Sequence, residues 1–398
     1  MAPHAPCYKR SLLILAEGRE GGPGDASLVR ESFISDGTSL AEVSSPCGSG
    51  LVRESFISEG TPLADVSTLS RTSSLPQERA YLLLVGAKHR PIRYRKSFSA
   101  VLPFPMHEPD MEFIRTRIET QVISLTGLAL GQLDLENPKG DPGLFGPQAV
   151  CWEVHSDFSS MLVGGISALM LQALHPLALA GIWDHSSFRQ DMLGRLRRTG
   201  QFLSGTTYGS TQDANWLIDK VRAIHLQVTG TALDGRPYAA SDPDLLTWVH
   251  VAEVSSFLAA HVRYHNPAMS PVDQDRYYAE TALVAERLGA RHVPRCRQAI
   301  ADYLANIRGQ LVCDDRSREV VRLLLDAPAP NWLAKPFGVL MMRAGIELLP
   351  VWASEMLDVT QSPLKRGLIR LGVNTTAPIL RWAVRDGSAQ RAKRRMGL

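Results

Sequence analysis

The stretch Met161-Leu-Val-Gly-Gly-Ile-Ser-Ala-Leu-Met-Leu-Gln-Ala-Leu-His-Pro176 is the most apolar helix-forming segment of this 398-residue sequence. Its length approaches that of a membrane-spanning helix, but Gln172 and Pro176 near its end are unusual in a span. Gly164 and Gly165 would let another backbone or a flat ligand come close. Because a helix that is apolar on all sides belongs in the core of a large domain, the stretch predicts a buried central helix.

The sequence around this stretch predicts further helices. From Met106 onward, apolar residues recur with helical spacing between Gly, Pro and Asp signals, whereas alternating and β-branched runs are sparse. We therefore predict an all-α fold, with a single large helical domain over residues 106–360. Helices are expected near residues 108–127, 157–180, 187–203, 212–229, 243–264, 272–288, 296–309, 315–326, 335–357 and 363–385.

Composition places the chain among globular proteins. It is 44% hydrophobic and 21% charged, with a mean hydropathy of −0.07, which argues against wholesale disorder and against a polytopic membrane protein. The net charge of +3 divides into 12 basic and 10 acidic side chains in residues 1–105, 22 and 29 in 106–362, and 9 and 1 in 363–398. A mildly acidic body is not typical of a nucleic-acid-binding protein, so no nucleic-acid partner is expected. Five scattered cysteines without C-x-x-C spacing favour a reducing compartment.

The first 105 residues differ from this body. The segment Leu28–Ser44 returns almost unchanged as Leu51–Ser67, and two copies of a short unit are too few for a stacked repeat fold. We interpret residues 1–105 as a low-complexity, disordered arm. Two explanations stay open: the arm is a genuine flexible terminus, or translation begins at Met106 or Met111.

The two ends of the sequence give predictions about where the protein is located and whether it contacts a membrane. The apolar run after Lys9-Arg10 is shorter than a secretory signal core, which predicts a cytoplasmic protein. Residues 361–398 form a basic, amphipathic tail in which Leu368, Leu371 and Trp382 stand among arginines. Such a tail could rest on anionic lipid at the inner face of a membrane, or it could pack on the body as an ordinary helix.

One histidine has the surroundings of a metal ligand. The segment 213–229 carries an apolar stripe at helical spacing, and His225 lies at its edge beside Ile224. A neutral imidazole on a rigid, apolar helix face is what a haem iron requires of a proximal ligand, and Arg222 one turn earlier could pair with a propionate. The alternative is a hydrogen-bonded core histidine without a ligand role.

A second segment, Arg195-Leu-Arg-Arg-Thr199, offers guanidinium groups and a hydroxyl to propionates or bound oxygen, or else it is a solvated basic helix face. Other cofactor patterns are incomplete. His261 and His265 have zinc-helix spacing without the catalytic glutamate, and His250-x-x-Glu253 is the reverse of a di-iron element. The Walker, G-x-G-x-x-G and G-x-S-x-G motifs do not occur in the sequence.

Taken together, these segments resemble the catalytic domain shared by bacterial rubber oxygenase (latex-clearing protein) and the fungal MpaB-type oxygenase of mycophenolic acid biosynthesis. The resemblance covers roughly residues 150–360 and consists of short motifs in a fixed order. They are Leu171-Gln-Ala-Leu-His-Pro176 with Ala180-Gly-Ile-Trp-Asp-His185, Arg195-Leu-x-x-Thr199, Arg222-Ala-Ile-His225-Leu-Gln-Val228, Tyr238-x-x-Ser-Asp-Pro243 with Leu246-Thr-Trp-Val-His250, and Glu347-Leu-Leu-Pro-Val-Trp352.

The resemblance implies a globin-reminiscent helical bundle that holds haem b, with His225 as the proximal iron ligand. It implies that Arg195 and Thr199 orient haem or oxygen, and that Arg222 neighbours His225. Rubber-cleaving members split carbon–carbon double bonds of isoprenoid chains with dioxygen, and the protein contributes the axial ligand, distal hydrogen-bond donors and a hydrophobic channel.

Two departures from the family pattern affect the distal side. Arg198 stands where rubber oxygenases have a distal lysine, and arginine is a poor iron ligand because it stays protonated. The distal glutamate has no counterpart around residues 177–180, where His175 is the nearest polar candidate, or else a histidine bonded to its neighbouring backbone. Rubber is therefore not the expected substrate.

Two functions follow from these observations. The first is a haem-dependent oxygenase or oxidoreductase that acts with dioxygen on an apolar, isoprenoid or lipid-like substrate. The second is a haem-free helical protein that uses the same cavity to bind a lipid or a partner. The colour of the purified protein distinguishes them, because only the first absorbs visible light through haem.

Overall fold

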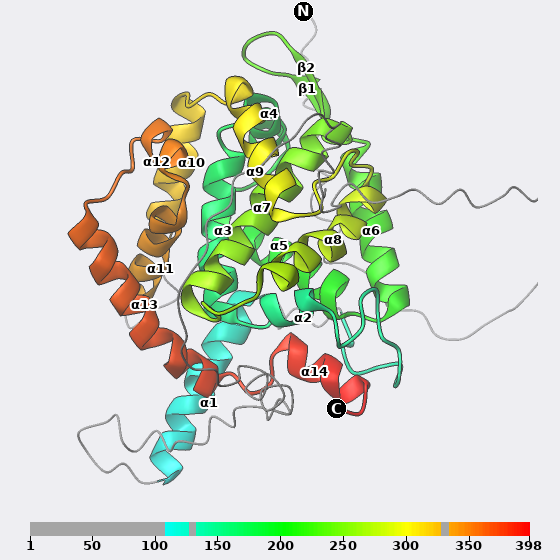
Figure 1. The fold of residues 1–398 in the computed structure, drawn as a ribbon, viewed down its shortest axis with the longest axis vertical. Coiled ribbons are helices and arrows are strands. Elements are labelled where there is room, and N and C mark those ends of the chain that lie inside the picture. Colours follow the sequence, from blue (N-terminus) through cyan, green and yellow to red (C-terminus); the bar gives the residue numbers. More distant parts are fainter. Residues whose placement is uncertain (1–107, 127–132, 328–333) are drawn as a thin grey trace, which may run out of the picture. The chain divides into compact units, whose positions relative to one another are not determined.

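The structure, a computed structural model, describes residues 108–126, 133–327 and 334–398 (Figure 1). The arm over residues 1–105, with its repeat, and Met106 lie outside the described residues, so the disorder predicted for the arm stays a prediction. Met111, the other candidate start, lies in the first turn of the first helix. Within the described residues the fold is all-α, as the sequence predicts, and its strands are confined to one short hairpin.

The elements follow one another in this order: α1 (Glu108–Thr126), α2 (Val150–Val154), α3 (Phe158–Gln172), α4 (Pro176–His185), α5 (Met192–Tyr208), α6 (Thr211–His225), β1 (Thr229–Thr231), β2 (Pro237–Ala239), α7 (Pro243–Tyr264), α8 (Pro271–Leu288), α9 (Arg297–Asn306), the 3-10 helix η4 (Ile307–Gln310), α10 (Asp315–Leu325), α11 (Lys335–Leu348), α12 (Val351–Met356), α13 (Pro363–Ala383) and α14 (Ser388–Arg395).

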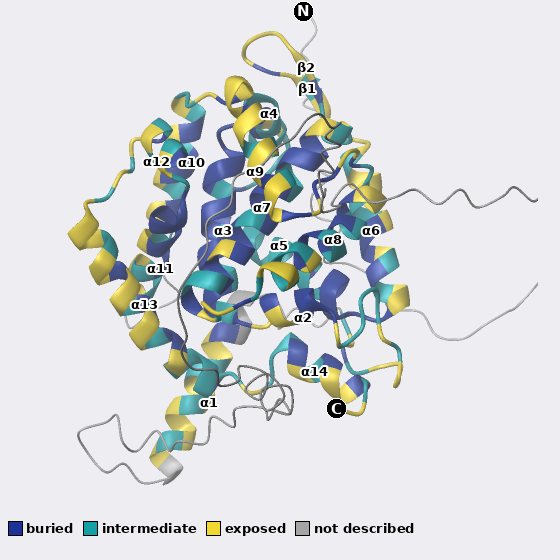
Figure 2. Ribbon diagram, in the orientation of Figure 1, coloured by how far each residue is buried: buried dark blue, intermediate teal, exposed yellow. Residues whose placement is uncertain are grey.

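The core is built around α3 and α7, which lie side by side at the centre of the fold and are largely buried (Figure 2). Gly164 makes their close approach possible. A Cβ atom at this position would lie 2.9 Å from the Cα of Phe257 and 3.0 Å from the carbonyl oxygen of Ser256, closer than side-chain carbons approach a backbone. The glycine that the sequence singles out therefore sits where two helix backbones touch.

Proline interrupts two of the expected helices. The segment 157–180 is two helices, α3 and α4, which meet at an angle of 106° just before Pro176. The segment 335–357 is likewise divided into α11 and α12 at Pro350. Proline fits the first turn of a new helix but lacks the amide hydrogen needed to continue an old one, so each break falls beside it.

Among the described helices, α7 alone is long and apolar enough to cross a membrane without a bend, and the bent α3–α4 pair passes the same test. Of the apolar window of α7, 67% is buried within the protein. Burial of this extent is typical of a core helix, which agrees with the place of α7 beside α3.

A hairpin follows α6 where the sequence predicts four more helical residues. β1 and β2 pair antiparallel with Thr229 opposite Ala239, and the hairpin packs on α4. The ring of His185 lies 3.2 Å from the carbonyl oxygen of Thr229 and 3.2 Å from the hydroxyl of Tyr238. The hairpin thus fixes the segment after His225 to the end of α4.

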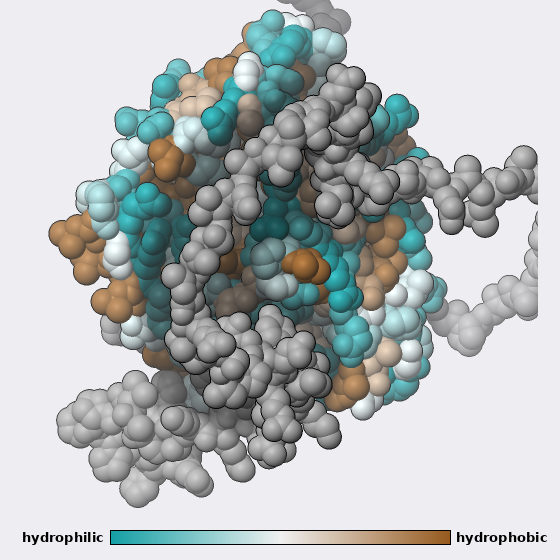
Figure 3. All heavy atoms as spheres, viewed as in Figure 1, coloured by the Kyte–Doolittle hydropathy of each residue, from teal (hydrophilic) through white to brown (hydrophobic). Residues whose placement is uncertain are grey.

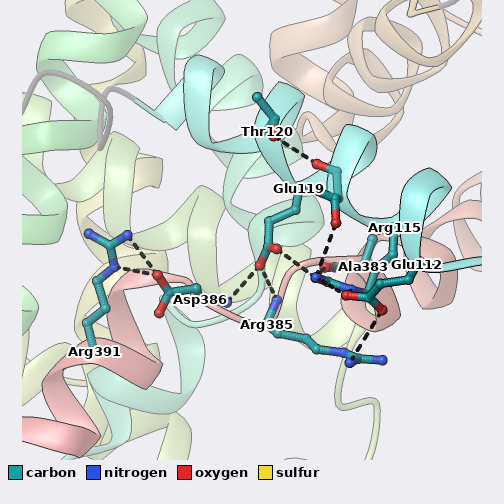
Figure 4. Close-up of polar contacts among 9 residues, drawn as sticks. Glu112, Arg115, Glu119, Thr120, Ala383, Arg385, Asp386 and Arg391 are labelled. Atoms are coloured by element: carbon teal, nitrogen blue, oxygen red, sulfur yellow. Dashed lines mark hydrogen bonds and ion pairs between the residues drawn. The ribbon is translucent and has the colours of Figure 1, made fainter. Parts of the chain in front are cut away.

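The C-terminal helices are fastened to the body at the link between them and at the end of α14. Glu119 of α1 accepts hydrogen bonds from the amides of Arg385 (2.7 Å) and Asp386 (2.9 Å), and it pairs with Arg115 (Figure 4). Arg395 in α14 is only 1% exposed, and its guanidinium donates to the carbonyl oxygens of Leu135, Asp141, Tyr208 and Gly209. Residues 363–395 therefore pack on the helical body in this structure.

Candidate active site

A cavity of about 410 Å³ lies between α3, α5 and α7, with α1 and the α13–α14 link completing its wall. Its volume is within the range of pockets that enclose small organic ligands, roughly 300–1,000 Å³. Most of the wall is hydrophobic, and Met161, Leu169, Leu203, Phe257 and Leu380 are typical contributors. A few polar side chains interrupt this surface, and they define the candidate site.

Arg195 and Thr199 line the cavity from α5, one helical turn apart on the same face. Asp191 caps the start of this helix, accepting a hydrogen bond from the amide of Gly194 at 2.7 Å, which fixes the first turn. Arg195 donates a hydrogen bond to the hydroxyl of Ser186 at 3.0 Å. Burial lowers the pKa of Arg195 to about 10, although the charge of Glu253 partly opposes this effect, so the guanidinium remains charged at neutral pH.

Glu253 lines the same cavity from the middle of the apolar helix α7. Burial raises its pKa to about 7, against the opposing effects of a hydrogen bond from Gln172 and the charge of Arg195. The amide of Gln172 lies 3.3 Å from a carboxylate oxygen of Glu253. Glu253 can therefore hold or release a proton near neutral pH, which suits a general acid or base.

Glu253 and Gln172 were not among the site residues predicted from sequence. Glu253 appeared there only as half of a reversed di-iron pattern, and Gln172 only as a polar residue in an apolar helix. The signal that could have identified Glu253 is its position. It is an acidic residue in the middle of a 22-residue helix whose buried residues are mostly apolar, and buried acids cluster at functional sites.

A second arginine in the cavity wall is already paired. Arg381 of α13 donates to both carboxylate oxygens of Asp157, at 2.8 and 3.0 Å, and to the carbonyl oxygen of Tyr264 at 2.8 Å. Burial opposes ionisation of Asp157, but the hydrogen bond and charge of Arg381 outweigh it and hold the pKa of the carboxyl below its usual value. This pair stabilises the wall and leaves little capacity for a ligand.

His225 lies at the last turn of α6 and is half-buried. Its Nδ1 atom is buried and has no hydrogen-bond partner among the described residues, and burial lowers the pKa of the imidazole, which keeps it neutral. His225 does not belong to the lining of the 410 Å³ cavity, and Arg222 is exposed to solvent.

The other two predicted site residues also lie outside the cavity lining. His175 caps the start of α4, where Nδ1 accepts the amide of Ala178 at 3.5 Å, and burial lowers its pKa to about 4. Arg198 lies 3.7 Å from a carboxylate oxygen of Asp191, with which it forms a partly exposed ion pair. Of the predicted set, the structure thus brings Arg195 and Thr199 together in the cavity.

The end of α4 connects the surroundings of Arg195 with those of His225. Ser186, directly after α4, accepts the hydrogen bond of Arg195, while His185 contacts the hairpin that follows His225. Leu217 of α6 also packs directly on Gly205 of α5.

Comparison with known proteins gives a match over residues 152–383, to the family described as "ER-bound oxygenase mpaB/B'/Rubber oxygenase, catalytic domain". No curated protein and no solved structure matches the chain. The matched region is more than half of the sequence and runs from just before α3 to the end of α13, so it contains α3, α5 and α7, between which the cavity lies. This confirms the resemblance inferred from the ordered motifs. The chain belongs to the mpaB/rubber oxygenase catalytic-domain family, and it is accordingly an oxygenase, hence an oxidoreductase.

Proposed function

We propose that the protein is a haem b-dependent oxygenase that acts with dioxygen on an apolar, lipid-like substrate, with His225 as the proximal iron ligand. The observation that carries the proposal is the cavity of the oxygenase domain, which is hydrophobic except for a few polar groups on α3, α5 and α7. An apolar substrate would be desolvated there, beside groups that can donate hydrogen bonds or transfer a proton.

The surroundings of His225 fit the requirement of a haem iron for its protein ligand. A proximal ligand must be a neutral imidazole with a free nitrogen, and His225 has a lowered pKa and a buried, unpaired Nδ1. The described residues include no group of three or more histidine, cysteine or acidic side chains that could hold a metal ion. Haem needs only one protein ligand, so His225 suffices.

The protein's own residues have separable roles in this proposal. Haem, when bound, supplies oxygen activation. His225 holds the iron, and Arg222 is free to pair with a propionate at the surface. Arg195 and Thr199 line the cavity with a guanidinium and a hydroxyl group, and these two groups can orient oxygen or substrate. Glu253, with a pKa of about 7, can hold or accept a proton at its carboxylate.

The visible spectrum of full-length protein expressed with haem supplied tests this assignment. We expect a Soret band that is lost or shifted in His225→Gly and restored when imidazole is added to that variant. His250→Gly is the matched control, because Nε2 of His250 is also buried without a hydrogen-bond partner among the described residues, and burial lowers the pKa of this histidine to about 4. A Soret band unchanged in His225→Gly would exclude this residue as the ligand.

The haem-free alternative predicts a different set of results. The purified protein would be colourless even when haem is supplied, and it would still bind an apolar ligand in the cavity. His225→Gly would then alter stability modestly, as expected for a half-buried side chain, and imidazole would have no spectroscopic effect.

We also propose peripheral contact with anionic lipid at the inner face of a membrane, mediated by α13. Leu364, Leu368 and Leu371 are 76%, 60% and 63% exposed, and their spacing of four and three residues places them on one face. Figure 3 shows hydrophobic surface at the edge of the molecule where α13 begins. The helix contains four basic and no acidic side chains, which suits an anionic surface.

Co-sedimentation with phosphatidylserine-containing vesicles tests this contact. We expect the wild-type protein to sediment with them, and the triple variant Leu364→Gln, Leu368→Gln, Leu371→Gln to remain in solution. Val272→Gln is the control, because Val272 is 74% exposed on α8, outside this face. Equal sedimentation of the wild type and the triple variant would rule out α13 as the contact.

A further inference from the structure

Arg195 differs from the other arginine of the cavity wall in having unused hydrogen-bonding capacity. Arg381 is saturated by Asp157 and a backbone carbonyl, whereas the only partner of Arg195 among the described residues is the hydroxyl of Ser186. No carboxylate of the described residues lies within 4.0 Å of it. A guanidinium has five N–H donors in a planar fork, so most of those of Arg195 are free.

A buried cation without a charged partner is costly, and a bound anion would remove that cost. The guanidinium fork matches a carboxylate, which can accept two parallel hydrogen bonds from it. Arg195 is thus complementary to a ligand carboxylate that enters from the cavity.

The rest of the cavity fits a hydrocarbon chain. Its wall combines aliphatic and aromatic side chains from several helices, among them Leu162 and Ile166 of α3, Leu196 of α5, Phe257 of α7 and Leu380 of α13. The other acidic and basic residues of the wall offer no free positive charge. Asp157 is paired with Arg381, Glu253 is uncharged for part of the neutral pH range, and burial lowers the pKa of His155 and of His265. One free positive charge in a hydrophobic chamber is the arrangement that an amphipathic acid requires.

We propose that the cavity binds a long-chain carboxylic acid, with its carboxylate at Arg195 and its hydrocarbon chain along the apolar wall. The inference rests on the proposed function in one respect, since it takes this cavity as the substrate chamber of the oxygenase. The substrate class it names is an amphipathic acid rather than a neutral hydrocarbon.

Glu253 makes this binding dependent on pH. The groups that interact with it are Arg195 on α5, Gln172 on α3 and Tyr277 on α8, and His155 lines the same cavity. Burial lowers the pKa of His155 to about 3, so only Arg195 is charged near neutral pH. Protonated Glu253 can donate a hydrogen bond to the ligand, whereas ionised Glu253 repels its carboxylate and competes for Arg195. Affinity for the acid therefore falls as pH rises through about 7.

The experiment measures displacement of fluorescent parinaric acid from full-length protein by oleic acid and by oleyl alcohol, which share the same chain. We expect the acid to compete at about tenfold lower concentration than the alcohol, a difference of roughly 1.4 kcal/mol. Arg195→Gln should remove this preference and leave competition by the alcohol within about twofold. Arg195→Lys should retain part of it, and Arg318→Gln, an exposed arginine of α10, should retain all of it.

Three results of this assay on haem-free protein would overturn the proposal. The first is equal competition by acid and alcohol in the wild type. The second is a preference for the acid that survives Arg195→Gln. The third is loss of acid and alcohol together in Arg195→Gln, because Arg195 would then maintain the cavity without recognising the head group. Glu253→Gln should make the acid preference independent of pH between about 6 and 8, as the neutral amide cannot ionise.

A haem propionate is also a carboxylate, so the measurement is repeated on haem-loaded protein. Retention of the Arg195-dependent preference supports a substrate carboxylate at Arg195. Its loss on haem loading would assign Arg195 to a propionate and overturn the proposal. Failure of the proposed function is seen separately, as absence of a Soret band, and does not affect acid binding by haem-free protein.

Discussion

At the scale of single residues, burial moves the ionisation of Glu253 into the neutral range. Its pKa of about 7 in the folded protein compares with 4.5 for a free side chain. Between these values the folded state binds more protons than the unfolded state, so stability falls as pH rises through this window and stays lower above it. The cost of ionising the buried carboxyl is at most about 3 kcal/mol.

We therefore predict that Glu253→Gln is stabilised relative to the wild type at about pH 8, and much less so at about pH 5. The amide oxygen can still accept the hydrogen bond from Gln172, so the substitution removes the charge and keeps the contact. Urea denaturation at both pH values measures the difference. Glu319→Gln, at an exposed ion pair with Arg322, should show no such dependence, and a pH-independent effect of Glu253→Gln would contradict the assigned pKa.

Arg395 offers a second prediction at the same scale. Its buried guanidinium donates hydrogen bonds to four backbone carbonyl groups, and Arg395→Ala would remove this donor. We expect a loss of about 3 kcal/mol in the free energy of unfolding. The neighbouring Arg394 forms partly exposed ion pairs with Glu136 and Asp386, so Arg394→Ala should cost less than about 1 kcal/mol. Denaturation of the two variants side by side checks the contrast.

At the scale of elements, two adjacent glycines of α3 should respond differently to the same substitution. A methyl group at Gly164 would press on the backbone of α7, whereas at Gly165 its nearest neighbour would be a ring carbon of Phe257 at 3.8 Å. We predict that Gly164→Ala destabilises the protein by about 1–3 kcal/mol. Gly165→Ala should be neutral, or stabilising by up to about 1 kcal/mol through helix propensity. Thermal denaturation distinguishes them, and equal melting temperatures would refute the close α3–α7 contact.

The helices also show which local sequence signals are enough to predict where a helix begins and ends. The expected helix at 243–264 is found with the same bounds as α7, because Asp242 caps it and Pro243 occupies its first turn. The break before Pro176 was missed because apolar periodicity continues across it, although proline itself marks the boundary. The helix α14 was missed for another reason. Its buried side chains are Ala389, Ala392 and Arg395, so the helix lacks the large apolar residues from which helical periodicity is recognised.

For the whole molecule, the boundary of the family match does not coincide with the boundary of the cavity. The match ends at residue 383, whereas residues 387–390 still line the cavity and Arg395 fastens them. We predict that a chain truncated after Asp386 melts at least roughly 5 °C lower and binds parinaric acid at least about tenfold more weakly. Melting curves and fluorescence titration measure both effects. Wild-type affinity in the truncated chain would show that α14 is dispensable for the cavity.

The candidate site was predictable from sequence only in part, since tertiary packing decides which polar residues meet. Arg195 and Thr199 were predicted as a motif on one helix, and spacing alone places them on the same face. Glu253 and Gln172 come from two helices whose pairing depends on the contact at Gly164, which no local pattern specifies. Arg381 was assigned to a basic tail, because its partner Asp157 is more than two hundred positions earlier in the sequence.

The opposite charges of Arg195 and Glu253 give the cavity an internal electric field. Above about pH 7, a positive group on α5 and a negative group on α7 act together as a dipole; below it, proton uptake by Glu253 leaves a lone positive charge. In an apolar chamber such a field acts on a bound molecule at a distance and with little screening. A nitrile group on a bound fatty ligand would report it as a vibrational frequency that changes with pH, and Glu253→Gln should hold that frequency constant. A single proton would thus set the polarisation of any double bond held in the chamber.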